Sequence, residues 1–177
     1  MRLFCKISIY GPVPCDIALN QREWNRLKAL AWTLVGKHWH EKLRPKHFTK
    51  QGAQEYRYQP RSGEPGTAKA DDFWHSYAGK KQRKSGENLP LVYTGETRSL
   101  SEQNNVIANS NGVRVTYDSL RKLNQYKPRS GIDLRAEFTA VSHEEEEELQ
   151  QLWINQMENI LRGFRGGGVK TIGNSGG

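Results

Sequence analysis

The chain has 177 residues, a formal net charge of +8 and a hydrophobic fraction of 35%. This length fits a single domain, and no segment approaches the run of about 20 apolar residues that a membrane-spanning helix needs. The N-terminus has no apolar stretch typical of a secretory signal, so we expect a soluble protein that is intracellular when it is made.

The low hydropathy and the positive charge both suggest partners. A mean hydropathy of -0.84 predicts a modest core, so part of the stability is expected to come from association with neighbouring subunits. The charge favours contact with a polyanion but identifies none. We expect one domain over residues 1–165, followed by a Gly-rich tail over residues 166–177 that is flexible unless a partner holds it.

A first strand is predicted at Phe4–Tyr10, where apolar and polar residues alternate, and the following GPVP ends it. Cys5 and Cys15 flank this turn, so a disulfide between them is geometrically feasible. Two cysteines in a chain without a secretory signal are more often free thiols, and their spacing matches no zinc site.

A long amphipathic helix is predicted at about residues 21–43. Asn20 and Glu23 have the spacing of a capping box at its start. Apolar residues then recur at steps of three and four, namely Trp24, Leu27, Ala31, Leu34, Val35 and Trp39. A tryptophan-rich stripe of this kind is typical of a core or a subunit contact. The candidate residues for a subunit interface are Trp24, Trp39, Trp74 and Tyr77.

A long basic loop is predicted at residues 59–90. Glycine, proline, lysine and arginine are frequent from residue 46 onward, with short helices expected only near Thr49–Tyr56 and Lys69–Tyr77. Loops of this length are usually functional or mobile. The candidate contacts to DNA or to a protein partner are Lys80, Lys81, Arg83 and Lys84, because such side chains neutralise phosphates without reading bases. A solvated loop explains the same run equally well.

The clearest β signal is a hairpin centred on Asn111-Gly112, a dipeptide favoured in type I′ turns. Its alternating apolar positions are Val106, Ala108, Val113, Val115 and Tyr117. The preceding stretch LPLVYTGETRSLSE, residues 89–102, is expected to be a turn and strand entry with bends at Pro90 and Gly95. A further strand is predicted at Ile132–Val141, where alternate apolar residues share one face.

The last predicted element is a helix capped by Ser142, with Glu145 three residues later. The acidic run Glu144–Glu148 lies in its first turn, where carboxylates meet the positive end of the helix dipole, so these glutamates need no catalytic role. The apolar residues that follow at helical spacing are Leu149, Leu152, Trp153, Met157, Ile160, Leu161 and Phe164.

The polar residues favour no catalytic, metal or nucleotide site. His38 and His40 are two apart on a predicted helix, so their side chains point about 200° apart and cannot readily share one ion. Asp71-Asp72 could belong to a magnesium-dependent nuclease, but the neighbouring sequence supplies no matching pattern, and the start of a short helix is the favoured interpretation. TGETRS lacks the glycine and lysine of a phosphate-binding loop. We therefore expect a protein that is no enzyme and has no cofactor or metal.

The sequence as a whole predicts an α+β fold, in which a small antiparallel sheet packs with a long N-terminal helix and a C-terminal helix. Two segments of this arrangement resemble the virion-morphogenesis or tail-completion (neck) proteins of tailed bacteriophages. One is Pro90–Leu100, which precedes the hairpin, and the other is Arg135–Ser142, which enters the acidic start of the last helix. The resemblance covers about residues 88–162 and departs from the family pattern at Thr97, Glu137, Thr139 and Ala140.

This resemblance implies a structural virion protein, made in the host cytoplasm, that joins head and tail around the DNA channel. It further implies a ring of six or twelve copies that contacts portal or adaptor and tail proteins and, without sequence specificity, packaged DNA. The four basic candidates would then face the channel or an adjoining ring. An alternative from the residues themselves is a sequence-independent nucleic-acid-binding protein that acts through the basic loop.

Overall fold

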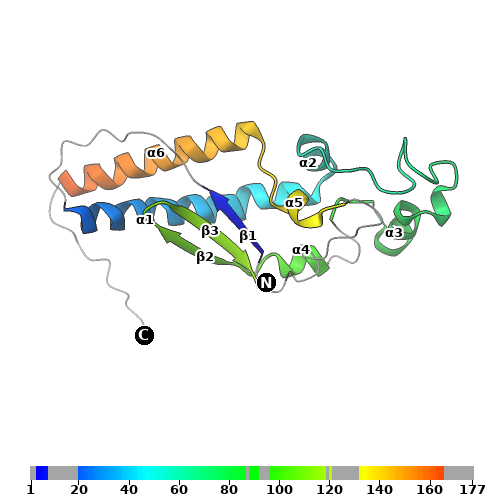
Figure 1. Cartoon of the computed structure of the whole chain (residues 1–177), viewed down its shortest axis with the longest axis horizontal. Coiled ribbons are helices and arrows are strands. Elements are labelled where there is room, and N and C mark those ends of the chain that lie inside the picture. Colours follow the sequence, from blue (N-terminus) through cyan, green and yellow to red (C-terminus); the bar gives the residue numbers. More distant parts are fainter. Residues whose placement is uncertain are drawn as a thin grey trace.

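The structure is a computed structural model that describes residues 3–7, 20–86, 88–91, 96–118, 120 and 132–165. It confirms the α+β class (Figure 1). The helices are α1 (Gln21–His38), α2 (Lys50–Glu55), α3 (Tyr77–Ser85), α4 (Glu96–Leu100), α5 (Leu134–Phe138) and α6 (His143–Arg165). The strands are β1 (Leu3–Ile7), β2 (Asn105–Asn109) and β3 (Gly112–Tyr117).

The three strands form one antiparallel sheet in the order β1-β3-β2. The predicted hairpin is confirmed, but its turn differs: Asn109 pairs with Gly112, so Ser110 and Asn111 are the two central residues. Neither has the positive φ that a type I′ turn requires. β1 pairs with β3 from Leu3 to Ile7, and the rest of the predicted first strand, with Cys15, lies outside the described residues.

Helix α1 lies between the sheet and α6, which runs antiparallel to it (Figure 1). Gly36 allows the close approach to the sheet, because a Cβ there would lie 2.6 Å from a methyl carbon of Val113. On the side of α6, the rings of Trp32 and Trp153 are 5.6 Å apart. The buried residues of the core are Leu27, Ala31, Trp32, Val35, Trp39, Leu43, Phe48, Val113, Val115, Tyr117, Leu120, Phe138, Leu149, Trp153, Met157 and Leu161.

Both long helices begin as the sequence predicts. Asn20 accepts a hydrogen bond from the Glu23 amide at 2.9 Å, and the Glu23 carboxylate accepts one from the Asn20 amide at 3.2 Å. Ser142 and Glu145 make the same reciprocal pair at the start of α6, at 3.3 and 3.2 Å. After α1 the chain continues in a π-helical segment, Trp39–Leu43, so the predicted helix 21–43 is confirmed with a change of winding.

Two predicted strand segments are helical instead. Residues 132–141 contain α5, because the Asp133 carboxylate accepts hydrogen bonds from the Arg135 and Ala136 amides at 3.0 Å and so caps a helix. Within residues 89–102, Glu96–Leu100 form α4 rather than a strand entry, and β2 starts only at Asn105. The bend expected at Gly95 lies outside the described residues.

The segment predicted as a long basic loop contains α3, so the basic run is helical. Ser76 accepts a hydrogen bond from the Gly79 amide at 3.1 Å and thereby sets the start of α3. The helix predicted at Lys69–Tyr77 is wrong: this segment forms turns and a short 3-10 helix at Phe73–His75. The helix predicted near Thr49–Tyr56 is confirmed as α2. The predicted tail, residues 166–177, lies outside the described residues.

Candidate functional site

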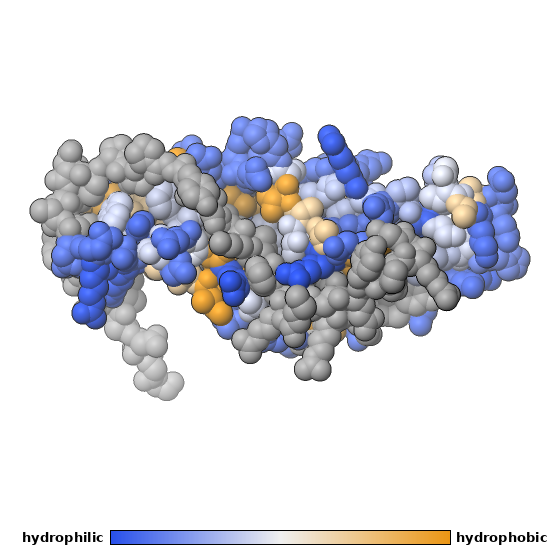
Figure 2. Space-filling view, in the orientation of Figure 1, coloured by the Kyte–Doolittle hydropathy of each residue, from blue (hydrophilic) through white to orange (hydrophobic). Residues whose placement is uncertain are grey.

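The positive charge of the chain is concentrated in residues 44–91, which we call the polar half. It carries ten Lys or Arg against five Asp or Glu, out of 27 and 19 in the whole chain. Figure 2 shows largely hydrophilic surface at the end of the molecule that holds α3, whereas hydrophobic surface lies over the half that holds the sheet. An anionic ligand would therefore be attracted mainly to the polar half.

Three of the four basic candidates lie on the exposed side of α3. Lys80, Arg83 and Lys84 are exposed, and the Arg83 guanidinium donates a hydrogen bond to the Trp74 carbonyl at 2.7 Å. Lys81 corrects the prediction, because it is only 3% exposed and its ammonium donates to the Leu89 carbonyl. Burial lowers the pKa of Lys81 to about 8. This side chain is part of the interior of the polar half and cannot contact DNA.

Two exposed aromatic residues adjoin these cations. Trp74 is 54% exposed and Tyr77 is 42% exposed, in the 3-10 helix and at the first position of α3. The Phe73 ring packs edge-on against Trp74, with the ring centres 5.2 Å apart. We call Trp74, Tyr77, Lys80, Arg83 and Lys84 the aromatic–basic surface. The sequence identified each of its members but assigned the aromatic and the basic residues to separate roles.

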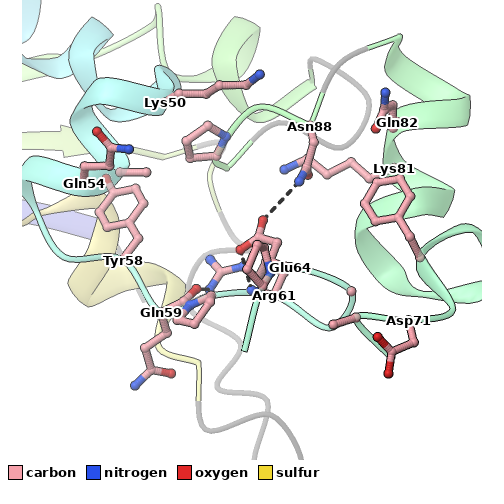
Figure 3. A pocket seen from close by; sticks show the side chains of 17 residues that line it. Lys50, Gln54, Tyr58, Gln59, Arg61, Glu64, Asp71, Lys81, Gln82 and Asn88 are labelled. Carbon is pink, nitrogen blue, oxygen red and sulfur yellow. Dashed lines mark hydrogen bonds between the residues drawn. The ribbon is translucent and has the colours of Figure 1, made fainter. Parts of the chain in front are cut away.

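A cavity of about 870 Å³ lies behind this surface, between α2 and α3 (Figure 3). Lys50 and Gln54 approach it from α2, and Lys81 and Gln82 from α3. In the middle, the Asn88 side-chain amide donates to one oxygen of Glu64 at 3.0 Å, and the Arg61 amide donates to the other at 2.8 Å. The Glu64 carboxylate therefore joins the turn that begins at Arg61 to the segment that follows α3.

Arg61 joins the polar half to α5. Its guanidinium donates two hydrogen bonds to Glu137, one of them at 3.0 Å to Oε1 and the other to Oε2. The Gln59 amide donates to the same carboxylate at 3.2 Å. Both side chains are largely buried. Paired guanidinium and carboxylate groups in this geometry form strong, directional bonds, so the pair fixes the position of the chain after Tyr58.

His47 lies fully buried where the polar half meets the core. Its Nδ1 is 2.5 Å from the Tyr58 hydroxyl and 3.1 Å from the Glu137 carbonyl, and its ring stacks on Tyr56 with centres 4.1 Å apart. Burial lowers the pKa of His47 to about 4, with the positive charges of Lys46 and Arg44 adding to the effect. The ring is therefore neutral near pH 7, and its role is packing and hydrogen bonding.

Glu145 makes the second connection between the polar half and the core. It accepts hydrogen bonds from the Tyr56 hydroxyl at 2.6 Å and from the Lys46 ammonium at 3.0 Å. Burial and the Glu145 charge raise the pKa of Tyr56, so this hydroxyl stays protonated as a donor. The acidic start of α6 thus contributes a buried structural carboxylate, which sequence spacing identified only as a cap.

The four aromatic residues predicted for a subunit interface differ in their exposure. Trp39 corrects the prediction, because it is fully buried among His47, Tyr117 and Phe138 and is part of the core. Trp24 is half-buried near the start of α1, with the Lys28 ammonium 5.8 Å from its ring centre. Trp74 and Tyr77 alone combine large area with exposure, as an interface would require.

Exposed aliphatic residues also lie on the part of the molecule formed by α1, α6 and the three strands, which we call the helix–sheet half, and none of them is among the four predicted interface residues. Leu30 and Leu34 lie one turn apart on α1 and are 50% and 36% exposed, and Ile107 in β2 is 51% exposed. Val106 and Ala108 pack against the core, so the alternation along a strand directs Ile107 away from it. Leu30 does not lie on the buried stripe of α1. A helical-wheel projection of the sequence would have shown this position.

Three of the histidines each contact one acidic residue, in different parts of the chain. His38 contacts Glu148 at 2.6 Å, His75 contacts Asp72 at 2.6 Å, and His143 contacts Glu147 at 3.4 Å. Within the described residues, no three His, Cys, Asp or Glu side chains group as metal ligands would. No helix in that part of the chain is long and apolar enough to cross a membrane.

Comparisons with protein-family models, with curated proteins and with solved structures gave no match to this chain.

Proposed function

We propose that this chain is a structural, non-enzymatic subunit of a tailed-phage virion, which assembles into a ring at the junction of head and tail as a neck, adaptor or tail-completion protein. The resemblance of Pro90–Leu100 and Arg135–Ser142 to such proteins supports the family. The observation that carries the proposal is that the helix–sheet half exposes large aliphatic side chains on two different surfaces, at Leu30 and Leu34 on α1 and at Ile107 on β2.

Two unlike apolar surfaces on one subunit favour head-to-tail association. When one surface of a copy meets the other surface of the next copy, the contacts close into a ring if the rotation between copies allows it. Such contacts would bury the aliphatic side chains that the monomer leaves in water. The low hydrophobic fraction of the chain agrees with stabilisation by neighbours. The resemblance suggests six or twelve copies, with portal, adaptor or tail proteins as further partners.

The decisive experiment combines mass spectrometry of purified virions with native mass spectrometry of the pure protein. We expect the chain in the particle and a discrete ring in solution. Leu30→Asp with Leu34→Asp, or Ile107→Asp alone, should give monomers. Asn109→Asp is the matched control, since it places a carboxylate on the exposed side of the same strand without removing apolar area. Absence from the particle, or a native monomer at all concentrations, contradicts the proposal.

A further inference from the structure

We propose that the aromatic–basic surface binds single-stranded nucleic acid, with bases stacked on Trp74 and Tyr77 and phosphates neutralised by Lys80, Arg83 and Lys84. The inference does not depend on the neck proposal, since it concerns a different half of the molecule and a different ligand. The nucleic acid is recognised by the two chemical features that every single strand offers, unpaired aromatic bases and a chain of negative charges.

The order of residues along α3 brings the two kinds of side chain together. Tyr77, Lys80 and Lys84 follow one another at steps of three and four, so they lie along one side of the helix. Arg83 lies beside them, and its hydrogen bond to the Trp74 carbonyl places its guanidinium at the aromatic end. A strand that stacks a base on Trp74 therefore meets the Arg83 guanidinium there, and its phosphates can continue along α3 toward Lys80 and Lys84.

The aromatic end is held rigidly before any ligand arrives. A Cβ on Gly79 would lie 2.1 Å from the Phe73 carbonyl oxygen, so the first turn of α3 packs directly against the backbone of the 3-10 helix. The Ser76 hydroxyl caps α3 and also donates to the Phe73 carbonyl. Phe73 supports the Trp74 ring from the side. A platform ordered in this way loses little conformational entropy when a base stacks on it.

The charges favour nucleic acid over a protein partner. Lysine is depleted from protein interfaces, and three cations in little more than one helical turn would each need a carboxylate from the partner. A phosphate chain supplies negative charge at every nucleotide. Asp71 and Asp72 precede the aromatic residues in the chain, and the carboxylate of Asp72 is engaged by His75 at 2.6 Å. Duplex DNA could contact the cations through its phosphates. Its bases are already stacked on one another, so they could not stack on Trp74.

The test measures binding of the full chain to a fluorescein-labelled 20-nucleotide oligothymidine and to a duplex of equal length, by anisotropy at low and moderate salt. We expect tighter binding of the single strand and quenching of tryptophan fluorescence. Trp74→Ala with Tyr77→Ala should weaken single-strand binding on the order of tenfold to hundredfold and leave the weak duplex binding nearly unchanged. Both side chains are exposed, so circular dichroism should confirm an intact fold.

A second variant tests whether binding depends on the position of the three cations of α3 or only on the net charge of the chain. Lys80→Gln with Arg83→Gln and Lys84→Gln should reduce the slope of log affinity against log salt by up to about 2. The matched control removes three exposed cations from α1 instead, as Arg22→Gln with Arg26→Gln and Lys37→Gln, and should leave the slope nearly unchanged. This pair of variants has the same net charge.

Three results overturn the inference. The first is absence of oligothymidine binding at low salt, and the second is equal loss of affinity in the α1 control. The third is a Trp74 and Tyr77 variant that binds oligothymidine normally but changes its oligomeric state, which would identify the surface as a protein contact. None of these results bears on whether the chain is present in virions.

Discussion

The helix–sheet half, formed by α1, α6 and the three strands, buries large apolar side chains, whereas the polar half buries charged and hydrogen-bonded ones. In the first, Trp32, Trp153 and Met157 fill the space between the helices. In the second, the buried side chains include Arg44, His47 and Lys81. The three non-glycine residues with positive φ among those the structure describes, Arg57, Lys69 and Leu91, all lie in the polar half.

The two halves are stabilised by different kinds of interaction. Apolar burial is non-directional and tolerates small shifts, so a periodic stripe is enough to bring helices and sheet together. Buried polar groups are stable only if each finds a partner in good geometry. The polar half therefore depends on a few specific bonds, above all those of Arg61 and Glu64, and a single loss there should be felt locally rather than throughout the molecule.

The largest expected effect is on the core. Trp39→Ala removes a fully buried ring that contacts Tyr117 and Phe138, and it should lower the free energy of unfolding by about 3–5 kcal/mol. Trp74→Ala is the control, since removing an exposed indole should change stability by less than about 0.5 kcal/mol. Urea unfolding of both variants gives the comparison. Similar losses in the two would mean that Trp39 is not part of the core.

The next effect is a pH dependence at the boundary of the halves. The pKa of His47 is lowered to about 4 in the folded chain from its ordinary value of 6.5, so between these pH values the unfolded chain binds more protons. The free energy of unfolding should therefore fall as the pH falls from about 6.5 to about 4, by up to about 3 kcal/mol, and this contribution should level off below.

Because carboxylates also titrate in this range, the measurement is a difference between variants. His47→Gln should flatten the pH profile of urea unfolding relative to the native chain, because it removes the buried imidazole. An unchanged profile in His47→Gln would show that this ring is protonated as easily in the folded chain as in the unfolded one.

A smaller effect concerns the attachment of the polar half. Glu137→Gln removes the negative partner of a largely buried Arg61 and should cost about 2–3 kcal/mol, less than a fully buried pair would. Hydrogen exchange should rise first in residues 59–91, before the helix–sheet half opens. Glu158→Gln, which breaks an exposed pair with Arg162, should change neither quantity measurably. Uniform loss of protection would contradict a locally held polar half.

The last effect is a pH dependence in the alkaline range, at Lys81. Burial lowers the pKa of Lys81 to about 8 from its ordinary value of 10.5, so the folded chain binds fewer protons than the unfolded chain between these pH values. Stability should therefore rise as the pH rises from about 8 to about 10.5. Lys81→Met should abolish this rise, whereas Lys80→Met should keep it. A rise of equal size in both variants would place its origin elsewhere.

The helix–sheet half was predictable because its elements are long and periodic. The capping pairs Asn20–Glu23 and Ser142–Glu145 and the stripe ending in Leu161 are local signals, and the structure contains them all. The polar half and α5, to which it is joined, were less predictable because their elements are short. Asp133 starts a five-residue helix where alternation suggested a strand, and Ser76 starts α3 where glycines suggested a loop.

The candidate site was predictable only in part, for a related reason. The basic residues and Trp74 are visible in the sequence, but burial decides their roles, and burial depends on contacts between distant segments. Lys81 is removed from the surface by the Leu89 carbonyl, and Trp39 by three rings from other elements. The pairing of Arg61 with Glu137 joins residues 76 positions apart, beyond the range of any local pattern.

The double role of Glu145 limits how the molecule can be divided. One carboxylate caps α6 through Ser142 and also holds Tyr56 and Lys46. Lys46 precedes α2 and Tyr56 follows it, so this carboxylate joins the start of α6 to both ends of α2. We expect fragments that separate at this point to be unstable individually, although each contains complete helices, so limited proteolysis should preserve the chain between Tyr56 and Glu145 or degrade it entirely.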